Sequence, residues 1–128
     1  MYIQLFISDH ATEGDRLLAV LRKAIPETPI IQYHGTGAVG RVVPTAFNEK
    51  IAAVIMVSGR EELASLARMN KTWERFKTIL VVPDGESETV ALGHAIRPVY
   101  TAFTSSDFSD VAAVLKHIRE SAGDDIYN

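Results

Sequence analysis

Four polar residues of the chain could together perform hydrolytic chemistry: Asp9, His10, Ser58 and Asp84. Each follows a run of apolar residues, and a Ser, a His and an Asp that meet in one crevice are the groups of a nucleophilic hydrolase. Ser58, however, has no glycine two positions before it, so the G-x-S-x-G nucleophile elbow is missing. Ser and Asp at strand ends are also ordinary helix caps. A catalytic crevice of Asp9, Ser58 and Asp84 is therefore an alternative and not the favoured interpretation.

A second candidate site is the glycine-rich segment GTGAVG at residues 35–40, which has the spacing G-x-G-x-x-G. Its glycines, Gly35, Gly37 and Gly40, would let backbone amides approach a pyrophosphate, and Glu61 follows at the distance of a ribose-binding acid. Against this reading, the motif follows the second apolar run rather than the first, and Pro44 leaves no convincing helix behind it. Binding of a nucleotide or cofactor through this loop is the alternative function, and no cofactor is assigned.

Composition excludes several other classes of protein. The 128 residues are 47% apolar and 23% charged, which is typical of one globular domain. The 13 basic residues are scattered and the net charge is −3, so we expect no nucleic-acid partner. No stretch is long and apolar enough for a membrane span, and the first residues lack the features of a signal peptide. With no cysteine and four histidines without helical pairing, we expect a cytoplasmic protein that holds no metal.

Short apolar runs alternate with amphipathic segments, a pattern that predicts an α/β fold. Strands are predicted over residues 2–8, 29–34, 51–58, 78–82 and 98–104. Helices are predicted over residues 12–25, 44–49, 60–76, 86–96 and 106–123, with Ser8 or Thr12 capping the first and Ser106 or Asp107 capping the last. We predict a single doubly wound, five-stranded parallel sheet of strand order 2-1-3-4-5, the flavodoxin-like three-layer sandwich. The domain would cover residues 1–123, with a tail at 124–128.

Two segments resemble the receiver domain of the response-regulator family. The C-terminal third, ALGHAIRPVYTAFTSSDFSDVAAVLKHIRE, is similar to the family's fourth helix, its fifth strand with an aromatic residue, the turn after it and its amphipathic fifth helix. The first predicted strand ends in ISDH, which resembles the opening strand of a receiver and its acidic pair. The resemblance covers nearly the whole chain and implies the same doubly wound fold.

The resemblance also implies that most of the family's phosphorylation site is missing. Receivers hold Mg²⁺ with two acidic residues, accept phosphate on an aspartate after the third strand, and contact the phosphate through a hydroxyl and a lysine. Asp9 matches one metal ligand, and His10 or Ser8 stands at the other. The remaining three positions carry Ser58, Pro83 and Ser105. Because a serine cannot form the acyl phosphate that a carboxylate forms, the chain resembles a degenerate receiver, or pseudo-receiver, that is not an enzyme.

The usual output face of receivers comprises the fourth helix, the fifth strand and the fifth helix. Here it would carry His94, Arg97 and Tyr100, and Tyr and Arg are residue types that anchor protein interfaces. Pro98 at the start of the last predicted strand marks that strand as a sheet edge. We therefore expect a regulatory domain that acts by binding another protein, or a second copy of itself, through this face.

Overall fold

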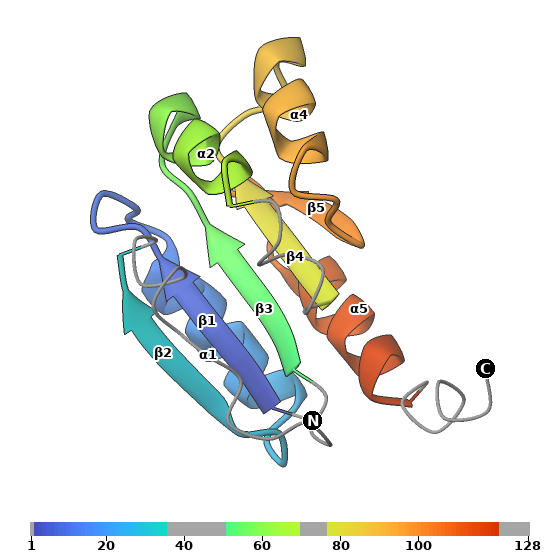
Figure 1. The fold of residues 1–128 in the computed structure, drawn as a ribbon. Coiled ribbons are helices and arrows are strands. Elements are labelled where there is room, and N and C mark those ends of the chain that lie inside the picture. Colours follow the sequence, from blue (N-terminus) through green and yellow to red (C-terminus); the bar gives the residue numbers. More distant parts are fainter. Residues whose placement is uncertain (1, 36–50, 70–76, 121–128) are drawn as a thin grey trace, which may run out of the picture.

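The fold is a parallel sheet of five strands, as the sequence predicts (Figure 1). The computed structural model describes residues 2–35, 51–69 and 77–120 of the chain. The strands are β1 (Tyr2–Ile7), β2 (Ile30–His34), β3 (Ile51–Met56), β4 (Lys77–Val82) and β5 (Tyr100–Phe103). They lie in the order β2-β1-β3-β4-β5, and each neighbouring pair is parallel. The predicted strand order is confirmed, and β5 is an edge strand.

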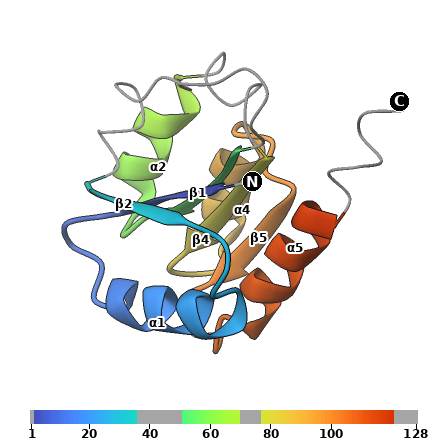
Figure 2. The same ribbon diagram turned by 90° about the horizontal axis from the view of Figure 1, so that it is seen from below.

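In the described part of the chain, four helices cover the two faces of the sheet. Helices α1 (Gly14–Ala24) and α5 (Ser109–Glu120) lie side by side on one face, and α2 (Arg60–Ala67) covers the other with α4 (Ser87–His94) (Figure 2). Helices α1 and α5 are amphipathic and turn their apolar stripes toward the sheet. The result is a three-layer sandwich with one core on each side of the sheet.

Strand β3 lies at the centre because its sequence suits burial on both faces. All six residues of Ile51–Met56 are buried, as expected of a continuous apolar run in a parallel sheet. Alternate residues of β3 contribute to the two cores, Ala52 and Val54 on the α1/α5 side and Ala53 and Ile55 on the α2/α4 side.

Helix α1 begins differently from the sequence prediction. Its N-cap position is Glu13, which makes no capping hydrogen bond through its side chain, so neither Ser8 nor Thr12 caps it. The chain first forms a turn, in which the N–H of Ala11 donates to the carbonyl of Ser8. Gly14 is the first residue of the helix. A larger residue would clash at this position, because a Cβ would lie 2.6 Å from a methyl carbon of Ile7.

Other boundaries also differ from the sequence prediction, and residues 70–76 of the predicted helix lie outside the described residues. Helix α2 ends at Ala67 rather than near residue 76, and a short turn from Leu66 to Met69 closes it. Strand β5 begins at Tyr100, two residues after the predicted start at Pro98. The predicted helix over residues 44–49, the predicted end of the last helix at Gly123 and the tail at 124–128 lie outside the described residues.

Candidate functional site

The hydroxyls of Ser8 and Ser58 meet beyond the carboxyl ends of β1 and β3. Ile7, the last residue of β1, is in register with Met56, the last residue of β3, so the residues after both strands share one edge of the sheet. Ser8 Oγ donates to Ser58 Oγ over 3.1 Å, and Ser8 is only 2% exposed. The side chain of His10 is exposed, whereas the hydroxyl of Ser8 lies beside that of Ser58.

The Ser8 hydroxyl and the nearby Glu62 carboxylate each accept a hydrogen bond from the main chain. The backbone N–H of His10 donates to Ser8 Oγ at 3.2 Å, and the backbone N–H of Ser58 donates to Oε1 of Glu62 at 2.9 Å. Glu62 lies in the first turn of α2, where the helix dipole favours a carboxylate. The centre of the site therefore holds two neutral hydroxyls, and the carboxylate of Glu62 is engaged by the main chain.

Asp9 lies on the β2 side of β1. It lines a small cavity of about 210 Å³ with Thr12, Asp15, Gln32 and His34 among the other residues of its wall. Gly35 follows β2 with a φ of 81°, which favours glycine, and a Cβ at that position would approach Oδ2 of Asp9 to 3.3 Å. The lining carries two carboxylates and so favours neutral or cationic groups over phosphates.

The predicted catalytic crevice does not assemble. Within the described ranges, no hydrogen bond or ion pair joins Ser58 to Asp9, to Asp84 or to the imidazole of His10. The described residues of the chain also contain no group of three His, Asp or Glu side chains that could hold a metal ion. Gly37 and Gly40 of the predicted phosphate loop lie outside the described residues, and only Gly35 can be placed. The hydrolase alternative therefore gains no support from the contacts of the described residues.

The turn after β4 forms no phosphate-binding hydroxyl site. Pro83, the first residue after the strand, is exposed and has neither a hydroxyl nor a backbone N–H to offer. Oδ1 of Asp84 accepts the backbone N–H of Glu86 at 3.0 Å, which is a local turn contact. Asp84 therefore shapes the start of α4.

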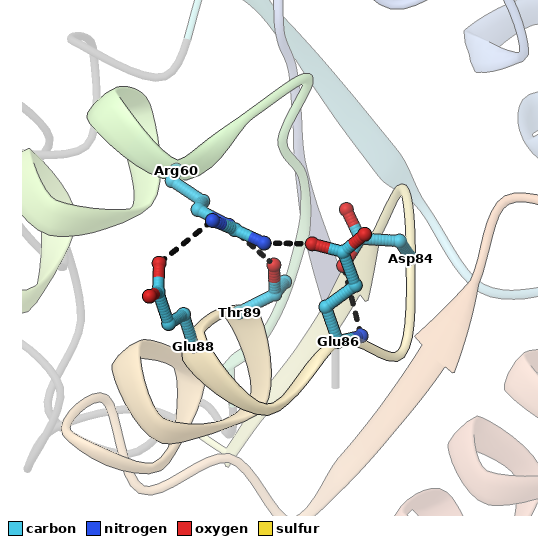
Figure 3. A network of polar contacts seen from close by, with 5 residues as sticks. All are labelled: Arg60, Asp84, Glu86, Glu88 and Thr89. Carbon is cyan, nitrogen blue, oxygen red and sulfur yellow. Dashed lines mark hydrogen bonds and ion pairs between the residues drawn. The ribbon is translucent and has the colours of Figure 1, made fainter.

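A polar network around Arg60 joins the first residue of α2 to the start of α4 (Figure 3). The guanidinium of Arg60 forms ion pairs with Glu86 and, at 2.7 Å, with Glu88, and it donates to Thr89 Oγ1 at 3.2 Å. Thr89 is buried, so this contact anchors the side chain beneath the two exposed carboxylates. Sequence reasoning missed Arg60, because no spacing signal links residues that are 26 to 29 positions apart.

A second arginine holds the turn after β5. Arg16 of α1 donates to the carbonyl oxygens of Thr104 at 2.7 Å and Ser106 at 2.6 Å. Its guanidinium also lies 4.3 Å from the centre of the Phe108 ring. Ser105, between the two carbonyls, is exposed and stands where the resemblance expects a lysine. The positive charge at this turn is therefore the guanidinium of Arg16 from α1, and it donates to main-chain oxygens.

The turn leads into α5 through the residues predicted to cap that helix. Oδ1 of Asp107 accepts the N–H and the hydroxyl of Ser109, and the hydroxyl of Ser106 accepts the N–H of Phe108. The hydrogen bonds from Ser109 hold the pKa of Asp107 below its usual value, and the positive charge of Arg16 acts in the same direction. Both residues predicted to cap α5 thus form hydrogen bonds in the turn before the helix, but α5 begins at Ser109, so neither stands directly before its first residue.

The predicted interface residues differ in how far they reach the surface. His94 and Arg97 are exposed, at the end of α4 and in the turn before β5. Tyr100 is half-buried against the α1/α5 core, and its hydroxyl donates to Asp110 of α5 at 2.7 Å. That hydrogen bond, together with burial and the charge of Asp110, raises the pKa of Tyr100. The exposed apolar side chains beside it are Val99 and Phe103, 50% and 37% exposed.

Comparison with known proteins places this geometry in a fold family. No protein-family model and no curated protein matches the sequence. Among solved structures, a CheY-like response regulator protein from Mesorhizobium loti superimposes with a TM-score of 0.68 at 12% identity, over 91% of this chain and 98% of its own. A putative pilus assembly protein from Burkholderia thailandensis gives 0.56 at 17% identity, over 94% and 99% of the two chains.

A third solved structure, the phosphorylated cyanobacterial phytochrome response regulator RcpA, has a TM-score of 0.56 at 14% identity and covers 94% of each chain. The parts of the chain that the structure describes contain no helix long and apolar enough to cross a membrane. The sequence identities of these three solved structures, 12%, 17% and 14%, support a shared fold alone. The fold of this chain is that of the CheY-like receiver domains.

Proposed function

We propose that the chain is a pseudo-receiver, a non-catalytic signalling domain of the cytoplasm that acts by protein–protein interaction and does not use aspartyl phosphorylation. The observation that carries this proposal is the hydrogen bond of 3.1 Å between the Ser8 and Ser58 hydroxyls. By resemblance to the receivers, these positions would hold a metal-binding acid and the phosphate-accepting aspartate.

Chemistry at such a site would differ from that of a receiver. Mg²⁺ prefers anionic oxygen ligands, and two neutral hydroxyls supply none of the negative charge that it needs. A serine hydroxyl also cannot form an acyl phosphate. The guanidinium of Arg16, the cation bound to the turn after β5, already donates to two carbonyl oxygens, so balancing a phosphoryl charge would require breaking those bonds.

Because this pocket lacks the groups for aspartyl phosphorylation, protein–protein interaction is the role that remains. The surface formed by α4, β5 and α5, called here the output face, presents His94 and Arg97 together with the exposed side chains of Val99 and Phe103. Basic and apolar groups side by side on a sheet edge are suited to a protein partner. The absence of cysteine from the sequence fits a reducing compartment.

Two experiments test the proposal. Incubation with acetyl phosphate and Mg²⁺ should add no phosphate to the intact protein by mass spectrometry, and Ser58→Asp alone should not restore labelling because the positions of the hydroxyl and the lysine remain Pro83 and Ser105. A stoichiometric phosphate adduct of the wild-type chain would refute the proposal.

The second experiment measures self-association by sedimentation, and capture of partner proteins, for His94→Ala and Arg97→Ala. Both substitutions remove exposed side chains of the output face and should reduce association without changing the circular dichroism spectrum. Arg22→Ala, an exposed position on α1, is the control. Equal association of all three variants and the wild type would contradict a role for this face.

The nucleotide alternative gains no support from the described residues. The cavity beside Gly35 is lined by Asp9 and Asp15, whose charges repel a pyrophosphate. A thermal shift with ATP and with NAD should therefore be absent. A ligand at a hundredfold excess over its dissociation constant would stabilise the protein by about 2.7 kcal/mol, an effect large enough to detect.

A further inference from the structure

We propose that the output face binds an extended, acidic segment of a partner protein, which adds to the open edge of β5 as a sixth strand and places apolar side chains in the groove between β5 and α5. The inference rests on the proposed function, because it gives the mode by which that face would hold its partner.

The main-chain groups of β5 are directed for such an addition. β5 is the last strand of the sheet, and within the described part of the chain no strand pairs with its outer side (Figure 1). The N–H of Thr104 donates to the carbonyl of Val82 at 3.0 Å, and Val82 is in register with Phe103, so the peptide groups of Ala102 and Thr104 face β4. Because successive residues of a strand alternate, those of Thr101 and Phe103 face the open side. An unpaired edge of this kind is a template for another extended chain.

A groove beside this edge would receive side chains of the added strand. It has a volume of about 500 Å³, within the range of ligand pockets, and lies between the amino ends of β4 and β5 and helix α5, with Lys77 at the start of β4 and Val99 just before β5. Its apolar wall consists of Val99, Ala113, Val114 and Ile118. Every second side chain of a strand that runs along β5 would point toward α5. The groove therefore suits a segment in which apolar residues alternate with polar ones.

Charge favours an acidic partner over a second copy of the chain. Lys77 and His117 line the same groove, and neither takes part in an ion pair within the described residues. Arg97 is exposed just before β5, whereas the nearby carboxylate of Asp110 is held by Tyr100. Two copies joined edge to edge would bring these basic groups together, which is unfavourable. A segment with Asp or Glu between its apolar residues would instead place carboxylates beside these basic groups.

The test selects random twelve-residue peptides displayed on phage against the full chain. The recovered peptides should contain acidic residues alternating with apolar ones and should shift the NMR signals of Val99 and Val114. Lys77→Glu, at an exposed position, should weaken their binding at least tenfold, whereas the charge-matched Arg22→Glu on α1 should leave it unchanged. Thr101→Pro removes an N–H that faces the open edge and should also weaken binding at least tenfold.

Thr101 is half-buried, so the folding of its variant is checked by circular dichroism, and Lys77→Glu remains informative whatever that check gives. Strand addition is overturned if no peptide is enriched, if the recovered peptides are basic, or if they bind Lys77→Glu as tightly as the wild type. Such a result leaves the proposed function standing when His94→Ala and Arg97→Ala still reduce association. If those variants also show no effect, the proposed function fails as well.

Discussion

Replacing Arg16 with methionine should destabilise the domain and loosen the turn after β5. The substitution keeps the aliphatic packing of the side chain but removes two charge-assisted hydrogen bonds, to the carbonyls of Thr104 and Ser106. It also removes the contact of the guanidinium with Phe108, at 4.3 Å from the ring centre. Phe108 is fully buried with a φ of 63°, a left-handed conformation that its surroundings must maintain.

The expected magnitude follows from these contacts. Each hydrogen bond to a charged group contributes about 1.5 kcal/mol at the lower end of its range, and exposure of Arg16 reduces that value. The cation–π contact adds about 0.5 kcal/mol at an exposed site. We expect Arg16→Met to lower the free energy of unfolding by about 2 kcal/mol. With a urea m value of about 2 kcal/mol/M, the midpoint should fall by about 1 M.

Urea unfolding monitored by circular dichroism measures the effect, and hydrogen exchange of the amides from Thr104 to Phe108 localises it. Arg16→Lys is the informative companion, since one ammonium cannot reproduce the two-pronged donation of a guanidinium and should recover only part of the loss. Arg22→Met, on the exposed surface of the same helix, is the matched control. A change no larger than that of Arg22→Met would refute the role assigned to Arg16.

Three further predictions concern stability. Thr78→Val should raise the unfolding free energy by up to about 1 kcal/mol in urea titrations, because the buried Thr78 Oγ1 has no hydrogen-bond partner among the described residues; a loss would mean that it is satisfied. Gly14→Ala should lower the free energy of unfolding by about 1–3 kcal/mol through the clash with Ile7. An unchanged urea midpoint would show that the Ile7 side chain moves aside without cost. The raised pKa of Tyr100 means that its hydrogen bond to Asp110 stabilises the fold below pH 10.0 and is lost as pH rises through the folded-state pKa. Tyr100→Phe should remove that part of the alkaline destabilisation, and identical pH profiles would contradict it.

The architecture could be predicted because it follows from local patterns. The fully apolar run Ile51–Met56 predicts a central strand, and the alternation of such runs with amphipathic helices leaves few arrangements other than a doubly wound parallel sheet. Element ends were predicted less well. The start of α1 depends on a turn and on the close approach of Gly14 to Ile7, which is a contact between residues on different elements.

The candidate site could be predicted only in part. The position of Ser58 after β3 follows from the sequence, whereas its pairing with Ser8 depends on the register of β1 against β3. The partners of Arg16 and Arg60 lie too far along the chain for any spacing rule to find them. The sequence predicts Tyr100 as a residue of the output face, but it does not indicate that the hydroxyl of Tyr100 donates to Asp110 of α5.

The most direct test of the pseudo-receiver proposal compares hydrogen exchange of α4, β5 and α5 with and without acetyl phosphate and Mg²⁺. A phosphorylatable receiver treated in parallel shows that the reagent is active. If the output face works without phosphate, the exchange rates of the amides of Ser87–His94, Tyr100–Phe103 and Ser109–Glu120 should be the same under both conditions. A change in protection in these elements that depends on both reagents would contradict the account.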